Sequence, residues 1–133
     1  LRLKEFAEHL KAQMKLLSID LDFVERSINV GFSGGEKKRA EMLQLAVLQP
    51  KVVILDEIDS GLDIDALKTV CAALNTVKAQ NPGMSVLLIT HYTRILNHIH
   101  ADHVHILKDG QIVRSGGPEL AQELEAKGYA GVI

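Results

Sequence analysis

The chain has 133 residues, with 15 Lys and Arg against 17 Asp and Glu, a formal net charge of −2, and it is 47% apolar and 24% charged. This globular composition supports one domain and argues against a disordered tail, a collagen-like repeat or a coiled coil. The near-neutral charge gives no electrostatic drive toward nucleic acid, so no nucleic-acid partner is expected.

Membrane insertion and secretion are not expected either. No apolar run approaches the roughly 20 residues that a membrane-spanning helix needs. The residues Leu1–Glu5 do not begin a secretory signal. The single Cys71 can form neither an internal disulfide nor a cysteine-rich metal site, which is typical of a reducing compartment. These features together predict a cytoplasmic location.

The first third of the chain predicts two long helices with a short helical segment between them. Apolar residues recur every third or fourth position from Leu3 to Leu17, which is the spacing of one helix face. Residues 18–29 predict a short connection and a further turn or two of helix, capped by Asp20 or Asp22. A second long helix is predicted from about Ser33 to Gln49, where the following Pro50 ends it.

The middle of the chain predicts a strand, a helix and a second strand. The apolar runs Val52–Leu55 and Ser85–Thr90 indicate strands that are buried on both faces. The segment Ile64–Gln80 between them is an amphipathic helix that ends at Asn81-Pro82-Gly83. This order predicts a right-handed crossover unit of a parallel sheet.

The last third predicts a hairpin and a closing helix. Residues His103–Leu107 and Gln111–Arg114 flank Lys108-Asp109-Gly110, and Asp-Gly is a strong signal for a hairpin turn. Residues Pro118–Lys127 predict a helix with Pro near its first turn and Gly128 just after its end.

The segment Ser33–Glu36 has two interpretations. As a capping box, the Ser33 hydroxyl bonds the amide of Glu36 while the Glu36 carboxylate reaches back, which contributes about 1 kcal/mol. As an anion site, Ser33 and two residues without Cβ, Gly34 and Gly35, let an anion approach the positive end of the helix dipole. A capping box does not need two consecutive glycines, which disfavour a helix, so the pair favours anion binding.

Two further segments follow the predicted strands. Asp56-Glu57 is either a turn with solvated carboxylates or a site where one carboxylate holds Mg²⁺ and the next orients an attacking water. On its own, His91 is best interpreted as a loop residue. If it lies beside Asp56-Glu57 at the sheet edge, it could donate a hydrogen bond to a transferring phosphoryl oxygen.

Other polar clusters favour structural roles. Four histidines near the predicted hairpin suggest a metal site only weakly, because they cross from a loop into a strand: His98, His100, His103 and His105, with Asp102. Lys37-Lys38-Arg39 fits the solvated face of its helix.

Four motifs in this chain resemble those of the ATP-binding cassette (ABC) ATPases. Phe32–Glu36 is similar to the signature loop, Val52–Glu57 to the Walker B strand with its catalytic Glu, Ser60–Asp63 to the D-loop, and His91 to the switch histidine. The resemblance covers essentially the whole chain. It implies an α/β fold: the C-terminal half of an ABC-type, RecA-like P-loop NTPase core, with a mostly parallel sheet flanked by helices, plus part of the helical subdomain.

The resemblance also implies a role for each of these residues. ATP and Mg²⁺ are the implied cofactors: Asp56 would support Mg²⁺ directly or through water, Glu57 would act on the lytic water, and His91 would contact the γ-phosphate. Two copies would form a transient, ATP-driven homodimer, head to tail. The implied nucleotide-binding residues are Ser33, Gly34, Gly35 and Glu36. The implied D-loop residues are Ser60, Gly61, Leu62 and Asp63, of which Asp63 would couple the two sites.

One family motif is missing from the chain. There is no G-x-x-x-x-G-K-[ST] sequence, so the Walker A loop is absent. We therefore expect this chain to be the C-terminal half of a longer ATPase. By itself, it should bind ATP weakly or not at all. Residues 1–50 would belong to the helical subdomain and residues 51–133 to the ATPase core.

Within the family, the chain is most similar to the SufC group, the soluble ATPases of Suf iron–sulfur cluster assembly. Such ATPases act on SufB- and SufD-like scaffold proteins. The similarity includes Ile58-Asp59, where many transport ATPases have Pro-Thr, and Gly128-Tyr129. The single Cys71 fits this role, because clusters are usually held by several thiolates, which partners would then supply.

Two alternatives remain open. The nucleotide-binding subunit of a membrane ABC transporter shares every catalytic motif described above. A non-catalytic interaction or regulatory module would show neither ATP turnover nor protection from unfolding by ATP and Mg²⁺.

Overall fold

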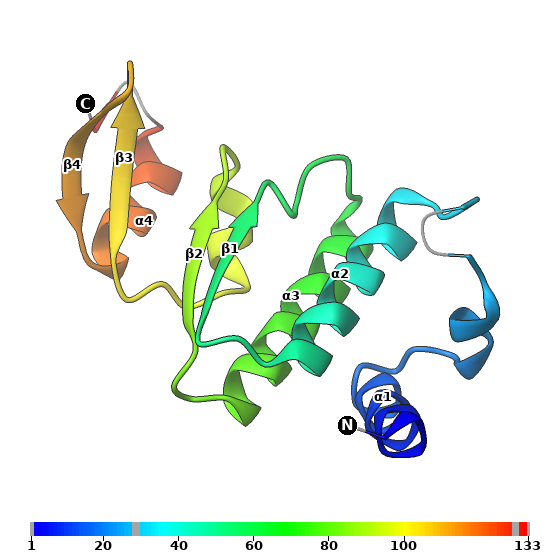
Figure 1. Cartoon of the computed structure of the whole chain (residues 1–133). Coiled ribbons are helices and arrows are strands. Elements are labelled where there is room, and N and C mark those ends of the chain that lie inside the picture. The colour runs from blue at the N-terminus through cyan, green and yellow to red at the C-terminus, as the bar shows by residue number, and fades with distance from the viewer. Residues whose placement is uncertain (1, 28–29, 129–130, 133) are drawn as a thin grey trace. The chain divides into compact units, whose positions relative to one another are not determined.

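The computed structural model describes residues 2–27, 30–128 and 131–132. The chain forms two compact units, Leu1–Ile89 and Thr90–Ile133, and each is described by itself. Figure 1 shows the elements of both units.

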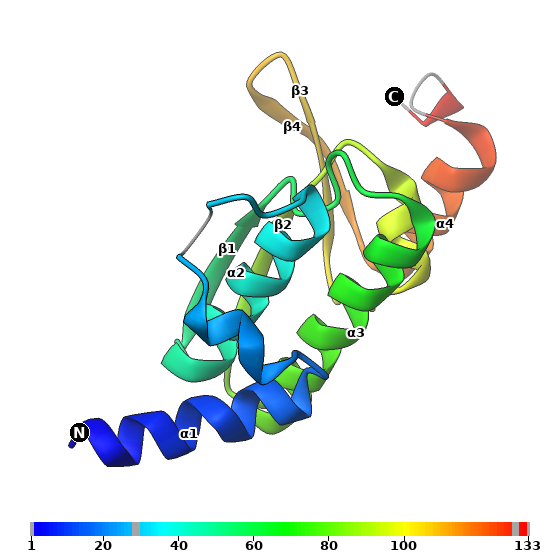
Figure 2. The same cartoon turned by 90° about the vertical axis from the view of Figure 1, so that its right-hand side faces the viewer.

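The first unit is a small parallel sheet with helices on one face. In chain order, its elements are α1 (Leu3–Leu16), the 3-10 helix η1 (Leu21–Glu25), α2 (Gly34–Leu48), β1 (Val52–Asp56), α3 (Ile64–Gln80) and β2 (Ser85–Ile89). Helices α2 and α3 pack side by side and lie on the same side of the strands (Figure 1). Helix α1 packs against α2, as Figure 2 shows from a second direction.

The predicted helix boundaries are confirmed by local interactions. The Asp63 side chain caps α3 at its start, and the chain leaves the helix at Asn81. Helix α2 ends with Gln49 in the left-handed conformation, directly before Pro50. Asp20, one of the two predicted caps, accepts a hydrogen bond from the amide of Asp22 at the start of η1.

Strands β1 and β2 are parallel, as predicted, with Val52 opposite Ser85 and Asp56 opposite Ile89. The prediction that they are buried on both faces is wrong for this unit. Ile54 remains 63% exposed and the neighbouring Leu87 52% exposed. The physical reason is that α2 and α3 cover one face only, so alternate residues of each apolar run have no layer above them.

The cores of the first unit consist mainly of aliphatic side chains. Met14, Ile19 and Leu43 form a buried cluster between α1 and α2. Helix α3 buries one stripe of residues at helical spacing, which explains why its amphipathic pattern could be recognised in the sequence: Leu67, Val70, Cys71, Leu74 and Val77.

The second unit combines a hairpin with α4. Its elements are the 3-10 helix η2 (Thr93–Asn97), β3 (Val104–Lys108), β4 (Gln111–Gly116) and α4 (Pro118–Lys127). The strands are antiparallel, and Asp109 and Gly110 both have positive φ, 50° and 76°, as a two-residue hairpin turn requires. The hairpin prediction is therefore confirmed. The core of this unit contains Val104, Ile106, Leu120, Ala121, Leu124 and Val132.

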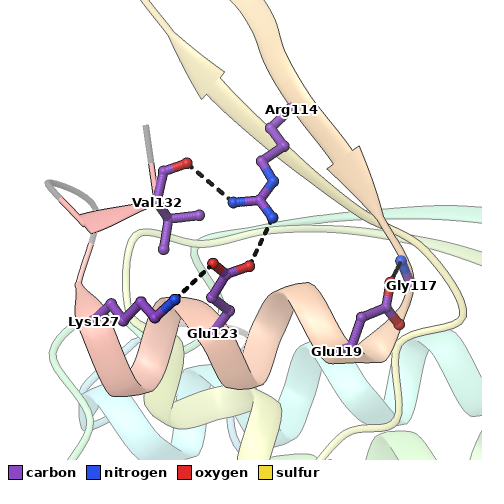
Figure 3. A network of polar contacts seen from close by, with 6 residues as sticks. All are labelled: Arg114, Gly117, Glu119, Glu123, Lys127 and Val132. Atoms are coloured by element: carbon purple, nitrogen blue, oxygen red, sulfur yellow. Dashed lines mark hydrogen bonds and ion pairs between the residues drawn. The ribbon is translucent and has the colours of Figure 1, made fainter.

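A polar network joins α4 to β4 (Figure 3). The Arg114 guanidinium donates to Glu123 Oε2 at 2.7 Å and to the carbonyl of Val132 at 3.1 Å, while Lys127 donates to Glu123 Oε1 at 3.2 Å. The pKa of Glu123 is lowered, first by the Arg114 hydrogen bond and then by that of Lys127. These partly exposed contacts join α4 and Val132 to the hairpin but add little stability.

None of the helices in the part of the chain that the structure describes has both the length and the apolar character needed to cross a membrane.

Candidate functional site

The start of α2 is a complete capping box. The Ser33 hydroxyl accepts a hydrogen bond from the Glu36 amide at 3.2 Å, and Glu36 Oε2 accepts one from the Ser33 amide at 2.8 Å. The capping interpretation of this segment is therefore confirmed. It leaves the anion interpretation open, because the box does not use the amides of the two residues between them, Gly34 and Gly35.

The packing of the chain does not explain why Gly34 is a glycine. A Cβ built at Gly34 would meet nothing within 4 Å, and one at Gly35 would meet only the Ala66 Cβ at 3.8 Å, an ordinary contact. Neither residue has positive φ. Since glycine disfavours a helix relative to alanine, its presence at Gly34 fits a close approach by a group from outside the chain.

Arg26, which the sequence analysis did not single out, holds the other oxygen of the Glu36 carboxylate. Its Nη1 lies 2.5 Å from Glu36 Oε1. This hydrogen bond, followed by the one from the Ser33 amide, lowers the pKa of Glu36 to about 2 from its ordinary 4.5. The capping carboxylate therefore stays ionised under all but strongly acidic conditions.

This pKa shift predicts how acid acts on the first unit. Because the pKa of Glu36 is lower in the folded chain, its stabilising contribution is fully present above about pH 4.5 and is lost as the pH falls toward 2. We expect Glu36→Gln to lower the free energy of unfolding at neutral pH, and the gap between the two proteins to close below pH 4.5. Urea unfolding across this range measures the gap, and a gap independent of pH would contradict the prediction.

The second part of the site is the turn between β1 and α3, which contains the four predicted D-loop residues. Gly61 has φ of 71°, a conformation that favours glycine. Leu62 is buried, whereas Ser60, Gly61 and Asp63 are exposed. Asp63 Oδ1 accepts a hydrogen bond from the Ala66 amide at 2.7 Å and so caps α3.

The cap predicts a difference between two substitutions at Asp63. Asp63→Ala should destabilise the first unit by about 1 kcal/mol, because the Ala66 amide loses its partner. Asp63→Asn should change the free energy of unfolding by only a few tenths, because an amide oxygen can accept the same bond. Chemical denaturation of both variants tests this, and equal losses would show that the hydrogen bond to the Ala66 amide is not what stabilises the unit.

The structure brings these two parts together around one hollow of about 430 Å³. Its lining residues are Ser33, Gly34, Gly35, Glu36, Arg39, Gly61, Leu62, Asp63, Ala66 and Val70. The amino-terminal ends of α2 and α3 therefore face the same space, and both carry positive partial charge. Arg39, which the sequence placed on a solvated helix face, adds a full positive charge there.

Asp56 and Glu57 are not among the residues that line this hollow. Both are exposed, and Asp56 is the last residue of β1. Glu57 has φ of 47°, which is uncommon outside glycine, and its amide donates to the Ile89 carbonyl at 2.9 Å. A strained residue held at the end of a strand is typical of functional positions.

The Asp56 carboxylate fits a magnesium ion by its chemistry and exposure. Mg²⁺ prefers oxygen ligands and usually keeps several waters, so that one or two carboxylates together with phosphate oxygens complete its shell. Asp56 offers one such oxygen ligand at the carboxyl end of β1.

The predicted switch residue, His91, belongs to the second unit and follows β2 by two residues. Its ring lies against that of Tyr92, with centroids 3.9 Å apart. The position of His91 beside Asp56 and Glu57 stays a prediction.

The other histidines gather no metal site in residues 2–27, 30–128 and 131–132, where no three His, Cys, Asp or Glu side chains could hold an ion together. His100 Nε2 is 4.0 Å from Asp102 Oδ1, and His105 Nδ1 is 2.8 Å from Ser115 Oγ.

Ile58 and Asp59, on which part of the family resemblance rests, are buried, and Asp59 is 0% exposed. Burial, and secondarily the charge of Asp59, raise the pKa of the Cys71 thiol to about 11. A buried, protonated thiol is a poor metal ligand. Tyr129, which also carries the resemblance, lies outside the described residues.

Known proteins resemble this chain over nearly its whole length. It is 54% identical over 125 residues to a "Probable ATP-dependent transporter" of Synechocystis, covering 94% of this chain and 48% of that protein. It is 53% identical over 127 residues to "Vegetative protein 296" of Bacillus subtilis, covering 96% and 48%. It is 51% identical over 129 residues to a "Probable ABC transporter ATP-binding protein" of Streptococcus pyogenes, covering 97% and 50%.

Solved structures agree with this fold. A nucleotide-free ATP-binding cassette from an ABC transporter superposes with a TM-score of 0.76 at 23% identity, covering 98% of this chain and 50% of that one. The cbiO1 protein of Clostridium perfringens, part of an ABC transporter complex, superposes with a TM-score of 0.73 at 26% identity, covering 96% and 48%. No family model matches the chain. The chain spans about half the length of the curated relatives it matches.

Proposed function

We propose that this chain, whose fold and relatives are those of the ATP-binding cassette ATPases, supplies the C-terminal half of an ATP-hydrolysing cassette. The whole enzyme would bind ATP between two copies and release the pair after hydrolysis. Its helical subdomain would include residues 1–50, and its ATPase core residues 51–133.

One observation carries the proposal. Gly34 is a helix-start glycine that the packing of the chain does not require, and it borders the hollow shared with Gly61 and Arg39. The free amides and dipole at the start of α2 and the Arg39 guanidinium are suited to a phosphate, whereas the start of α3 is already capped by the Asp63 carboxylate. The open space above Gly34 lets a phosphate from a second molecule reach those amides.

The remaining residues would act on the opposite side of the same phosphate. Glu57 would orient the attacking water and accept its proton, and His91 would donate a hydrogen bond to a γ-phosphate oxygen. Asp56 would hold Mg²⁺, which when bound neutralises charge on the β- and γ-phosphates. Asp63, at the start of α3, would link this site to its counterpart in the other copy.

A photoreactive ATP analogue that carries its reactive group on the γ-phosphate tests the proposed site directly. In the complete ATPase, we expect it to label the peptide that contains Ser33–Glu36, and excess ATP to prevent labelling. Specific labelling confined to other segments would contradict the proposal.

Two kinds of protein complex are candidates for the assembly that this ATPase drives. The names of the relatives from Synechocystis and Streptococcus pyogenes favour a membrane transporter, of which the chain would form part of the nucleotide-binding subunit. The Ile58-Asp59 pair favours the SufC-like alternative, in which ATP-driven closure acts on SufB- and SufD-like scaffolds. Purification of the complete ATPase from its own cells, with identification of bound proteins, separates them: permease subunits support the first, and soluble scaffold proteins support the second.

A further inference from the structure

Arg26 contacts the segment before α2 at several points. Its Nη1 binds Glu36 Oε1, and its Nη2 lies 3.4 Å from the carbonyl oxygen of Gly31. Its guanidinium also lies over the Phe32 ring, 4.6 Å from the centroid. One side chain thus holds residues on both sides of Ser33.

The Phe32 ring that contacts the guanidinium belongs to an aromatic pair. The rings of Phe23 and Phe32 are stacked with centroids 4.7 Å apart, and Arg26 lies 5.7 Å from the Phe23 centroid. Phe23 belongs to η1, so the stack joins η1 to the segment that leads into α2. An ion pair alone would not fix the guanidinium in this way, because exposed pairs are weak and mobile.

These contacts determine the charge beside the amides of Gly34 and Gly35. Glu36 Oε2 is bound to the Ser33 amide and Oε1 to Arg26, so both oxygens of the carboxylate are occupied. Without the guanidinium, the carboxylate would keep its full negative charge at the end of the helix where a phosphate must approach. Like charges at such short range repel each other.

We propose that Arg26 is a positioning residue for phosphate binding: it holds the Gly31–Glu36 segment in place and neutralises Glu36, so that the start of α2 accepts a phosphate. The inference rests on the proposed function, since the phosphate belongs to ATP bound in the complete enzyme. Arg26 itself does not line the hollow at Gly34 and touches no reacting atom.

The test compares Arg26→Met with Arg26→Lys in the complete ATPase. With MgATP, we expect Arg26→Met to weaken dimerisation about fivefold, because the unpaired Glu36 carboxylate then repels the phosphate. Arg26→Lys should recover most of this loss, because it restores the charge. Sedimentation velocity measures the dimerisation constant.

Arg114→Met is the matched control, because Arg114 also pairs with a glutamate and donates to a backbone carbonyl, but in the second unit. It should leave ATP-driven dimerisation unchanged.

Two further readouts distinguish neutralisation from a merely structural role. In a Glu36→Gln background, Arg26→Met should weaken dimerisation less than it does in the unsubstituted protein, because no carboxylate remains to be neutralised and only the contacts with Gly31 and Phe32 are lost. The loss caused by Arg26→Met should also shrink as salt rises. A loss that is undiminished both in the Glu36→Gln background and at high salt would overturn the inference.

Failure of the inference and failure of the proposed function give different results. An ATP-dependent dimer of the unsubstituted protein that Arg26→Met leaves intact would overturn the inference alone. If the unsubstituted protein forms no dimer with ATP, the proposed function fails, and the inference with it. Amide exchange of the peptide around Ser33 should also be faster in Arg26→Met, and unchanged exchange would contradict the positioning role.

Discussion

Replacing Glu57 by Gln should slow ATP hydrolysis of the complete enzyme by ~10² or more. The amide has nearly the same shape as the carboxylate but cannot accept a proton from water. Glu57 is exposed at the end of β1, and its amide is bonded to the Ile89 carbonyl, so the backbone geometry should survive the substitution. Steady-state phosphate release measures the loss.

The same variant should still bind ATP, and it should accumulate as an ATP-bound dimer because the step that releases the pair is blocked. Glu8→Gln, on α1, is a suitable control that changes the same functional group far along the chain. Normal turnover by Glu57→Gln would remove Glu57 from the reaction.

The second large effect, on dimerisation, is expected at Ser33, where two substitutions separate the effect of charge from that of helix capping. Ser33→Asp and Ser33→Asn both supply an oxygen that can accept the Glu36 amide, so both should keep the stability of the first unit. Only Asp adds a negative charge. At about 4 Å from a phosphate, that charge costs about 4 kcal/mol at an effective dielectric constant near 20.

We therefore expect Ser33→Asp to weaken ATP-driven dimerisation of the complete enzyme a hundredfold or more, at roughly 1.4 kcal/mol per factor of ten. Ser33→Asn should weaken it much less. Thermal unfolding without nucleotide provides the stability control. Equal dimerisation by the two variants would mean that the start of α2 acts only as a helix cap.

The elements that the sequence predicted well carry their own boundary signals. Helix α3 begins at the capping Asp63 and ends at Asn81-Pro82-Gly83, and the hairpin turns at Asp109-Gly110. In each case, the residues that determine the conformation lie within the segment itself. Local signals of this kind do not depend on the rest of the fold.

The features that the sequence predicted wrongly, or did not predict, depend on contacts between distant segments of the chain. A continuous apolar run in the sequence does not indicate whether one or both faces of β1 are covered. In the structure, Ile54 and Leu87 are exposed because helices lie on one side of the strands only. The shared hollow depends on how α2 packs on α3, where Gly35 and Ala66 come close.

Arg26 lies in residues 18–29, where the sequence shows no clear hydrophobic period. The only signal that could have found it is its place between two aromatic residues, Phe23 and Phe32, that precede the capping box. Sequence patterns also could not place His91 relative to Glu57, because that depends on the packing of the whole enzyme.

The central claim is that Ser33 of one copy and Glu57 of the other act on the same phosphate, and mixing two inactive variants tests it most directly. Pairing the complete Glu57→Gln enzyme with Ser33→Asp puts both defects in one site and leaves the other site intact. Each mixed dimer has one intact site, so turnover of the mixture should rise well above that of either variant alone. If mixing restores no turnover while mixed dimers form, Ser33 and Glu57 act within one copy, and the account is wrong.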